Sequence, residues 1–125
     1  MSVTWTEIEV AGLASATSTE VELERRGYLD TIIYERATGG SEYDSGATLT
    51  VEAVLPTGFT AQPVLTAVSL NASASWRPRT PAHVAAGTAV TDSTEMIALC
   101  NFQLRFSVTN GGAGKTGKFL VIYRR

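Results

Sequence analysis

The stretch FQLRFSVTN, residues 102–110, alternates between apolar and polar side chains. Phe102, Leu104, Phe106 and Val108 would lie on one side of an extended chain, and the residues between them are polar. Because successive side chains of a β-strand point to opposite faces, this pattern predicts a half-buried strand. It is the clearest strand signal in the chain and the starting point for the fold.

The last apolar run, KFLVIYR at residues 118–124, is apolar on both faces, which is typical of an interior strand. The glycine-rich segment NGGAGKTG separates it from the strand at 102–110. Glycines tolerate the positive φ angles of tight loops, so we expect the two strands to pair as a hairpin.

Three further runs rich in β-branched and aromatic residues predict strands: residues 28–36, 47–55 and 63–76. Glycine- and proline-containing segments separate them. The stretch TSTEVELERRGYLD, residues 17–30, is ambiguous, because Thr17 and Glu20 have the spacing of a helix capping box. Its alternation, with Gly27 in the interior, favours a strand.

Seven to eight short strands without a convincing helix predict an all-β fold, an antiparallel, jelly-roll-like β-sandwich formed as a single domain by residues 1–125. Residues 1–10 are a possible N-terminal arm. The proline-containing connection at residues 77–94 is too long for a plain hairpin, so we expect it to cross between sheets or to reach a partner.

Composition narrows the class of protein. A formal charge of −2 and a pI near 5.3, with scattered basic residues, argue against nucleic-acid binding. The single Cys100 cannot form an internal disulfide. No run is long enough for a membrane span, and the N-terminal residues lack the features of a secretory signal. We therefore expect synthesis in the cytoplasm and no membrane partner.

The search for catalytic chemistry yields little. In NGGAGKTGK, residues 110–118, Thr109 occupies the position where a phosphate-binding loop needs its first glycine, and a strand follows in place of a helix. His83 is the only histidine and has no metal-ligating neighbours in sequence. We expect no catalytic, metal or cofactor site and no enzymatic activity, with paired carboxylates in a cleft as the remaining hydrolase alternative.

Two stretches suggest a protein interface. In SWRPRTPAH, residues 75–83, the side chains of Trp76, Arg77, Arg79 and His83 lie on a stiff, proline-rich segment. They are also compatible with covering one end of the core or with stacking on a sugar. At the N-terminus, the apolar residues Val3, Trp5, Ile8 and Val10 suit the addition of a strand to a neighbouring subunit.

Taken together, these segments resemble a family of small proteins encoded by tailed bacteriophages. The resemblance rests on GYLDTI at 27–32, TLTV at 48–51, the W-x-P-R-x-P-x-H-x-x-x-G stretch at 76–87, the Leu99-Cys100 pair and the closing strand, loop and strand at 105–124. Where the family commonly has an acid after the loop histidine, this chain has Val84.

The resemblance implies a virion structural protein that decorates or cements the capsid across neighbouring subunits. Its partners would be the major capsid protein or another virion protein, and its own copies in a homotrimer. The alternative from another class is a receptor- or carbohydrate-binding module of a tail or head fibre. That alternative is motivated by Trp76, Tyr43 and Phe59, aromatic residues in loop-like stretches.

Overall fold

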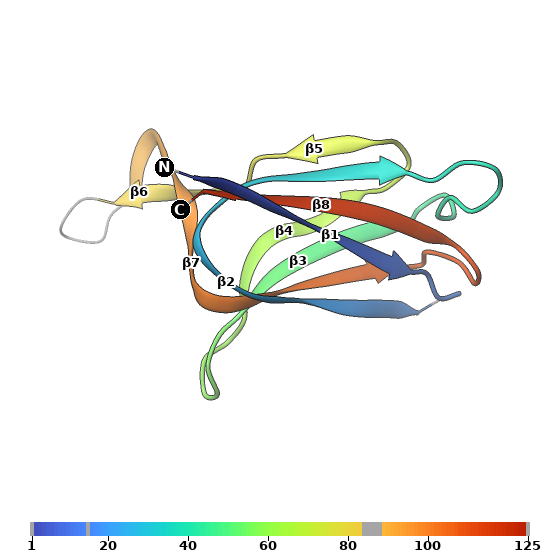
Figure 1. Ribbon diagram of the computed structural model, residues 1–125, viewed down its shortest axis with the longest axis horizontal. Coiled ribbons are helices and arrows are strands. Elements are labelled where there is room, and N and C mark those ends of the chain that lie inside the picture. Colours follow the sequence, from blue (N-terminus) through green and yellow to red (C-terminus); the bar gives the residue numbers. More distant parts are fainter. Residues whose placement is uncertain (1, 15, 84–88, 125) are drawn as a thin grey trace.

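The computed structural model describes residues 2–14, 16–83 and 89–124, and for residues 18–26, 81–83, 89–93 and 100–102 it describes the backbone alone. Every regular element in these ranges is a β-strand, and all strand pairs are antiparallel (Figure 1). The strands are β1 (Val3–Ala11), β2 (Thr17–Arg36), β3 (Thr48–Val54), β4 (Gln62–Ser69), β5 (Ala74–Trp76), β6 (Arg79–His83), β7 (Ala89–Thr109) and β8 (Thr116–Arg124). The predicted all-β, antiparallel fold is confirmed, including a strand in the ambiguous stretch at 17–30.

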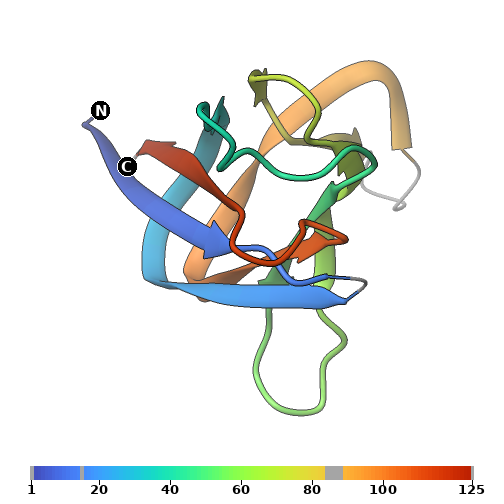
Figure 2. The ribbon, with the colours of Figure 1, turned by 90° about the vertical axis from the view of Figure 1, so that its right-hand side faces the viewer.

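The strands form a hydrogen-bonded ladder in the order β1–β8–β2–β7–β3–β4, with β5 added to β2 and β6 to β7. The ladder folds back on itself because β2 and β7 bend sharply (Figures 1 and 2). The end of β2 pairs with β8 and β5, whereas its start pairs with β7. The first layer of the sandwich therefore contains β1, β8, the end of β2 and β5, and the second contains the start of β2, the end of β7, β3 and β4.

The bend in β2 coincides with two register shifts between Glu22 and Arg26 and with Gly27, whose φ is +102°. Register irregularities bend a strand, and glycine adopts a positive φ without the steric cost of a Cβ atom. Two of the expected short strands are consequently much longer, with 20 residues in β2 and 21 in β7. The jelly-roll connectivity stays a prediction.

The core lies between the two layers and follows the predicted alternation. Leu104, Phe106 and Val108 of β7 are buried on one face, as expected, and the side chain of Phe102, expected on the same face, lies outside the described residues. Alternate residues of β3 and β8 are buried in the same cluster: Leu49, Val51, Ala53, Phe119, Val121 and Tyr123. The rings of Phe106 and Phe119 contact each other with centroids 5.6 Å apart, which joins the two layers.

The predicted hairpin between residues 102–110 and 118–124 is wrong. β8 pairs with β1 and β2, while β7 pairs with β2, β3 and β6. The glycine-rich loop is a corner between layers, where Asn110 and Gly112 adopt φ angles of +58° and +96°. Facing each other across the core, the two strands bury the apolar sides that both of them carry.

The connection at residues 77–94 is long because it contains β6, which pairs antiparallel with the start of β7. The resulting β6–β7 hairpin extends beyond the sandwich at the end where β2 and β7 bend (Figure 1). Residues 84–88 at its turn lie outside the described residues. Whether this hairpin reaches a partner stays a prediction.

Candidate docking face

The first layer carries apolar side chains on the side that points away from the core. We call this side the outer face; its residues alternate along each strand with buried residues. It comprises Val3, Trp5, Glu7 and Glu9 of β1, Lys118, Leu120, Ile122 and Arg124 of β8, and Tyr28, Thr31, Ile33 and Glu35 of β2. An antiparallel sheet that faces water on one side normally has polar residues there. The apolar residues on this face therefore indicate a surface that binds a partner.

The strand register makes the apolar residues contiguous. Trp5 lies opposite Ile122, and Leu120, two residues earlier on β8, lies opposite Ile33. Leu120, Ile122 and Ile33 are half-buried, while Trp5 is 67% exposed at the edge of the sheet. A large aromatic side chain left in solvent beside aliphatic neighbours is typical of a protein interface.

A shallow groove of about 410 Å³ crosses this face between β1 and β2. Trp5, Ile33 and Leu120 form its apolar part, and Glu7, Glu35 and Lys118 line it as well. The Nζ atom of Lys118 lies 3.9 Å from a carboxylate oxygen of Glu7. The groove thus combines an apolar floor with charged groups around it, as a docking surface with an apolar centre and a polar rim does.

Glu7 and Glu35 both line this groove and are therefore the carboxylates to weigh for the hydrolase alternative. Both side chains are exposed, and they stand on an open sheet face rather than in a desolvated cleft. A general acid of the glycosidase type needs an environment that keeps its carboxyl group protonated near neutral pH. Their exposure does not favour that role.

Of the predicted N-terminal interface residues, two lie on the outer face. Val3 and Trp5 are 53% and 67% exposed, respectively. Ile8 points to the opposite side and packs against the core. Residues 3–11 are not a free arm, because β1 pairs with β8 along its whole length. The apolar residues of this segment alternate, and the core takes one set while the outer face takes the other.

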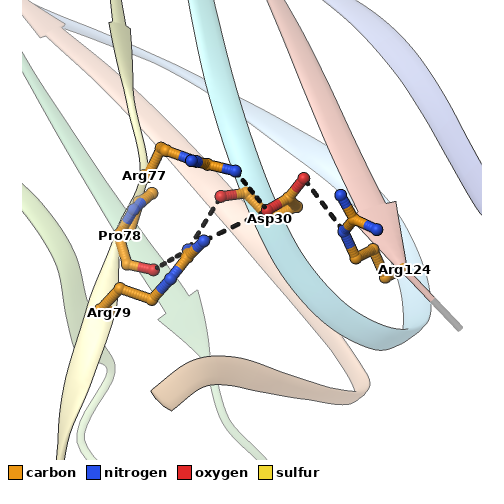
Figure 3. Close-up of polar contacts among 5 residues, drawn as sticks. All are labelled: Asp30, Arg77, Pro78, Arg79 and Arg124. Atoms are coloured by element: carbon orange, nitrogen blue, oxygen red, sulfur yellow. Dashed lines mark hydrogen bonds and ion pairs between the residues drawn. The ribbon is translucent and has the colours of Figure 1, made fainter. Parts of the chain in front are cut away.

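At the other end of β8, three arginines surround Asp30 (Figure 3). Asp30 is the extra residue where the β2–β8 register shifts between Leu29 and Thr31, and it is only 6% exposed. Arg79 donates hydrogen bonds to its carboxylate at 3.2 Å and to its main-chain carbonyl at 2.9 Å. Arg124 Nε lies 3.2 Å from the second carboxylate oxygen, and Arg77 lies 3.7 Å from the first.

Desolvation by itself would raise the pKa of Asp30. The positive charge of Arg124, with the hydrogen bonds from Arg124 and Arg79, outweighs it and holds the pKa below its ordinary value. The carboxylate therefore stays ionised and ties β2, β8 and the start of β6 together. Because one carboxylate faces three guanidinium groups, this cluster has a surplus of positive charge.

The proposed interface residues of the proline-rich segment have different surroundings in the structure. Trp76 is half-buried, packs against the core and stacks with Tyr34 at a centroid distance of 6.4 Å. Arg79 is occupied by Asp30, whereas the side chain of Arg77 is 66% exposed. The backbone of His83 ends β6, and its side chain lies outside the described residues. Trp76 thus serves the core, and Arg77 is the residue available to a partner.

The aromatic residues that suggested the carbohydrate-binding alternative differ in their exposure to solvent. Tyr43 was expected in an exposed loop, but it is 1% exposed, and its hydroxyl donates a hydrogen bond to the carbonyl of Val10. Phe59 is 70% exposed in the loop between β3 and β4, which projects from the sandwich (Figure 2). Trp76, Tyr43 and Phe59 therefore do not form a shared exposed surface on which a sugar could stack.

The glycine-rich loop turns the chain, as its sequence predicts, although the two strands that it joins do not pair with each other. The main-chain amide of Gly112 donates to the carbonyl of Leu13, and the Asp44 carboxylate lies against Gly112 where a Cβ atom would be. Lys115 Nζ donates to the carbonyl of Gly40 at 2.8 Å. An acidic side chain against the loop and a lysine already bonded elsewhere do not suit an anion.

Asp30 and the apolar band of Ile33, Leu120 and Ile122 were not predicted as site residues. A signal for the band was present, because KFLVIYR is apolar on both faces while its strand has only one face toward the core. For Asp30 the signal was weaker: a lone acid between the apolar residues of YLDTIIY. Its arginine partners lie far away in sequence.

Among the described residues, no group of three or more His, Cys, Asp or Glu side chains could hold a metal ion. The same part of the chain has no helix of the length and apolar character needed to cross a membrane. Comparison of the chain with protein-family models, with curated proteins and with solved structures gave no match.

Proposed function

We propose that this protein is a non-enzymatic structural subunit whose outer face is covered by another protein in an assembly. The observation that carries the proposal is the contiguous apolar band around Trp5, which is 67% exposed while its neighbours Leu120 and Ile122 are half-buried. Trp5 is an exposed aromatic anchor beside apolar neighbours, the arrangement found at the centre of protein interfaces.

The rigid setting of this band supports binding rather than turnover. β8 lies between β1 and β2, so its outward residues are fixed by hydrogen bonding on both sides. A preformed surface loses little conformational entropy when a partner covers it. The charged groups that line the groove would then set the orientation of that partner.

The narrower role in this proposal is decoration or cementing of a bacteriophage capsid, with the major capsid protein or another virion protein as partner. It rests on the resemblance of the sequence segments. A trimer is the self-assembly that the resemblance implies. Many copies on one particle would hold through multivalency even where each contact is weak.

The test uses capsids of the encoding phage prepared without this protein. Purified protein is added, and the copies bound per particle are counted. We expect saturable binding by the wild type and at least tenfold weaker binding by Trp5→Ser, about 1.4 kcal/mol or more for an interface aromatic. Phe59→Ser, an equally exposed aromatic on another surface, is the matched control. Wild-type protein that does not bind capsids would overturn the decoration role.

A further inference from the structure

The charges at the two ends of the outer face are opposite. The acidic end has Glu7, Glu9 and Glu35 with Lys118 as the only cation among them. At the basic end, Arg124 of the outer face and the neighbouring Arg77 and Arg79 surround Asp30. Among these side chains, the acidic end carries a surplus of two negative charges and the basic end a surplus of two positive charges. The apolar band lies between them.

We infer that the protein that covers the outer face is a second copy of the same chain, related by a twofold axis, so that a capsid is bound through other surfaces of the pair and a dimer replaces the trimer that the resemblance implies; this inference rests on the proposed function. The axis lies in the plane of the face and runs across the strands. Rotation about it places apolar band on apolar band and brings each acidic end over the basic end of the other copy. A twofold axis along the strands would instead place like charges together, which is unfavourable.

The size of the face sets the expected strength. β1 has nine residues, about 30 Å at about 3.3 Å per residue, and three strands span about 14 Å. Each copy therefore offers about 400 Å² of sheet, or about 800 Å² for the pair, which is the size of a weak, transient interface. We expect a concentration-dependent dimer with a Kd on the order of 10 μM.

A charge exchange tests the orientation. Glu35 is exposed at the acidic end and Arg77 at the basic end, and in the twofold pair these two ends meet twice. Glu35→Lys or Arg77→Glu alone would place like charges together at both of these symmetry-related contacts. A mixture of the two variants would restore opposite charges at both, and so would the double variant within one chain.

The measurement is sedimentation velocity over about 1 to about 200 μM protein, a range around the expected Kd. We expect each single variant to raise the Kd at least about tenfold, and the mixture and the double variant to return to the wild-type value. Circular dichroism verifies that each variant is folded. Thr57→Lys and Thr60→Glu, charge changes in the exposed β3–β4 loop, are the controls and leave the wild-type Kd unchanged.

Wild-type protein that stays monomeric to about 200 μM, a mass of three chains, or a mixture that fails to restore the dimer would each overturn the twofold pair. Monomeric protein that still binds capsids through Trp5 would refute this inference and leave the proposed function standing. Monomeric protein that binds no capsid would count against both.

Discussion

The ring of Tyr43 occupies the space where a side chain on Gly117 would begin. The same tyrosine donates a hydrogen bond from its hydroxyl group to the carbonyl of Val10, and its ring stacks with that of Tyr34. The loop before β3 therefore reaches under β1 and β8 and closes one end of the core.

Substitution of Gly117→Ala should destabilise the fold by about 1–3 kcal/mol, because the new methyl group would overlap the Tyr43 ring in a packed core. Gly114→Ala is the control: that position has open space, and a side chain at its φ of +73° costs about 1 kcal/mol. Urea unfolding gives both values. Equal losses of unfolding free energy in the two variants would show that overlap with the Tyr43 ring does not cause the destabilisation.

Substitution of Tyr43→Phe removes the hydrogen bond to Val10 and should cost about 1 kcal/mol. Burial raises the pKa of Tyr43, so the neutral phenol stabilises the fold at neutral pH. That contribution is lost as the pH rises above the ordinary tyrosine value of about 10. The free energy of unfolding, measured from pH 8 to 11, should become less different between the wild type and Tyr43→Phe as the pH rises. A difference between the two proteins that stays constant from pH 8 to 11 would contradict this role of the Tyr43 hydroxyl group.

Asp30→Asn should lower the free energy of unfolding by about 1.5–3 kcal/mol at pH 7, since three partly exposed arginines would lose their carboxylate. The pKa of Asp30 is lowered in the folded state, so its contribution is present above the unfolded value of about 3.9. It disappears as the pH falls through the lower folded value. Denaturant unfolding from pH 7 to pH 2 should therefore bring the two proteins together at the acid end, and a constant difference would contradict the ionic role.

Glycan binding should not depend on Trp76, because that ring packs on the core and on Tyr34. A glycan array with the wild type is expected to give no signal above that of an unrelated protein. Phe59→Ala and Trp76→Ala provide the comparison. A specific signal lost in the folded Trp76→Ala protein would revive the carbohydrate-binding alternative and count against the proposed assembly role.

Local alternation was enough to predict the strands and most of the core. In β3 and β7 the residues that alternate in sequence are the ones that are buried: Leu49, Val51, Leu104, Phe106 and Val108. Alternation is a local property, and it survives whatever strand lies alongside. Strand partners are not local, so the pairing of β8 with β1 and β2 could not be deduced from the short loop before it.

The errors at single residues have a similar cause. Tyr43 and Trp76 lie in segments that look like surface loops, but glycine at position 117 and the position of Tyr34 make room for them in the core. The Asp30 cluster joins positions 30, 77, 79 and 124, which only the register shift in β2 brings together. The outer face could have been anticipated once β8 was known to have a single buried side.

The two bent strands also determine how the molecule comes apart. Because β2 and β7 each belong to more than one part of the ladder, neither layer of the sandwich can lose its order while the other keeps all of its hydrogen bonds. Separate melting of the layers is therefore disfavoured, and heat should unfold the sandwich in a single cooperative step. A subunit built in this way holds its exposed surface in one shape until the whole domain unfolds.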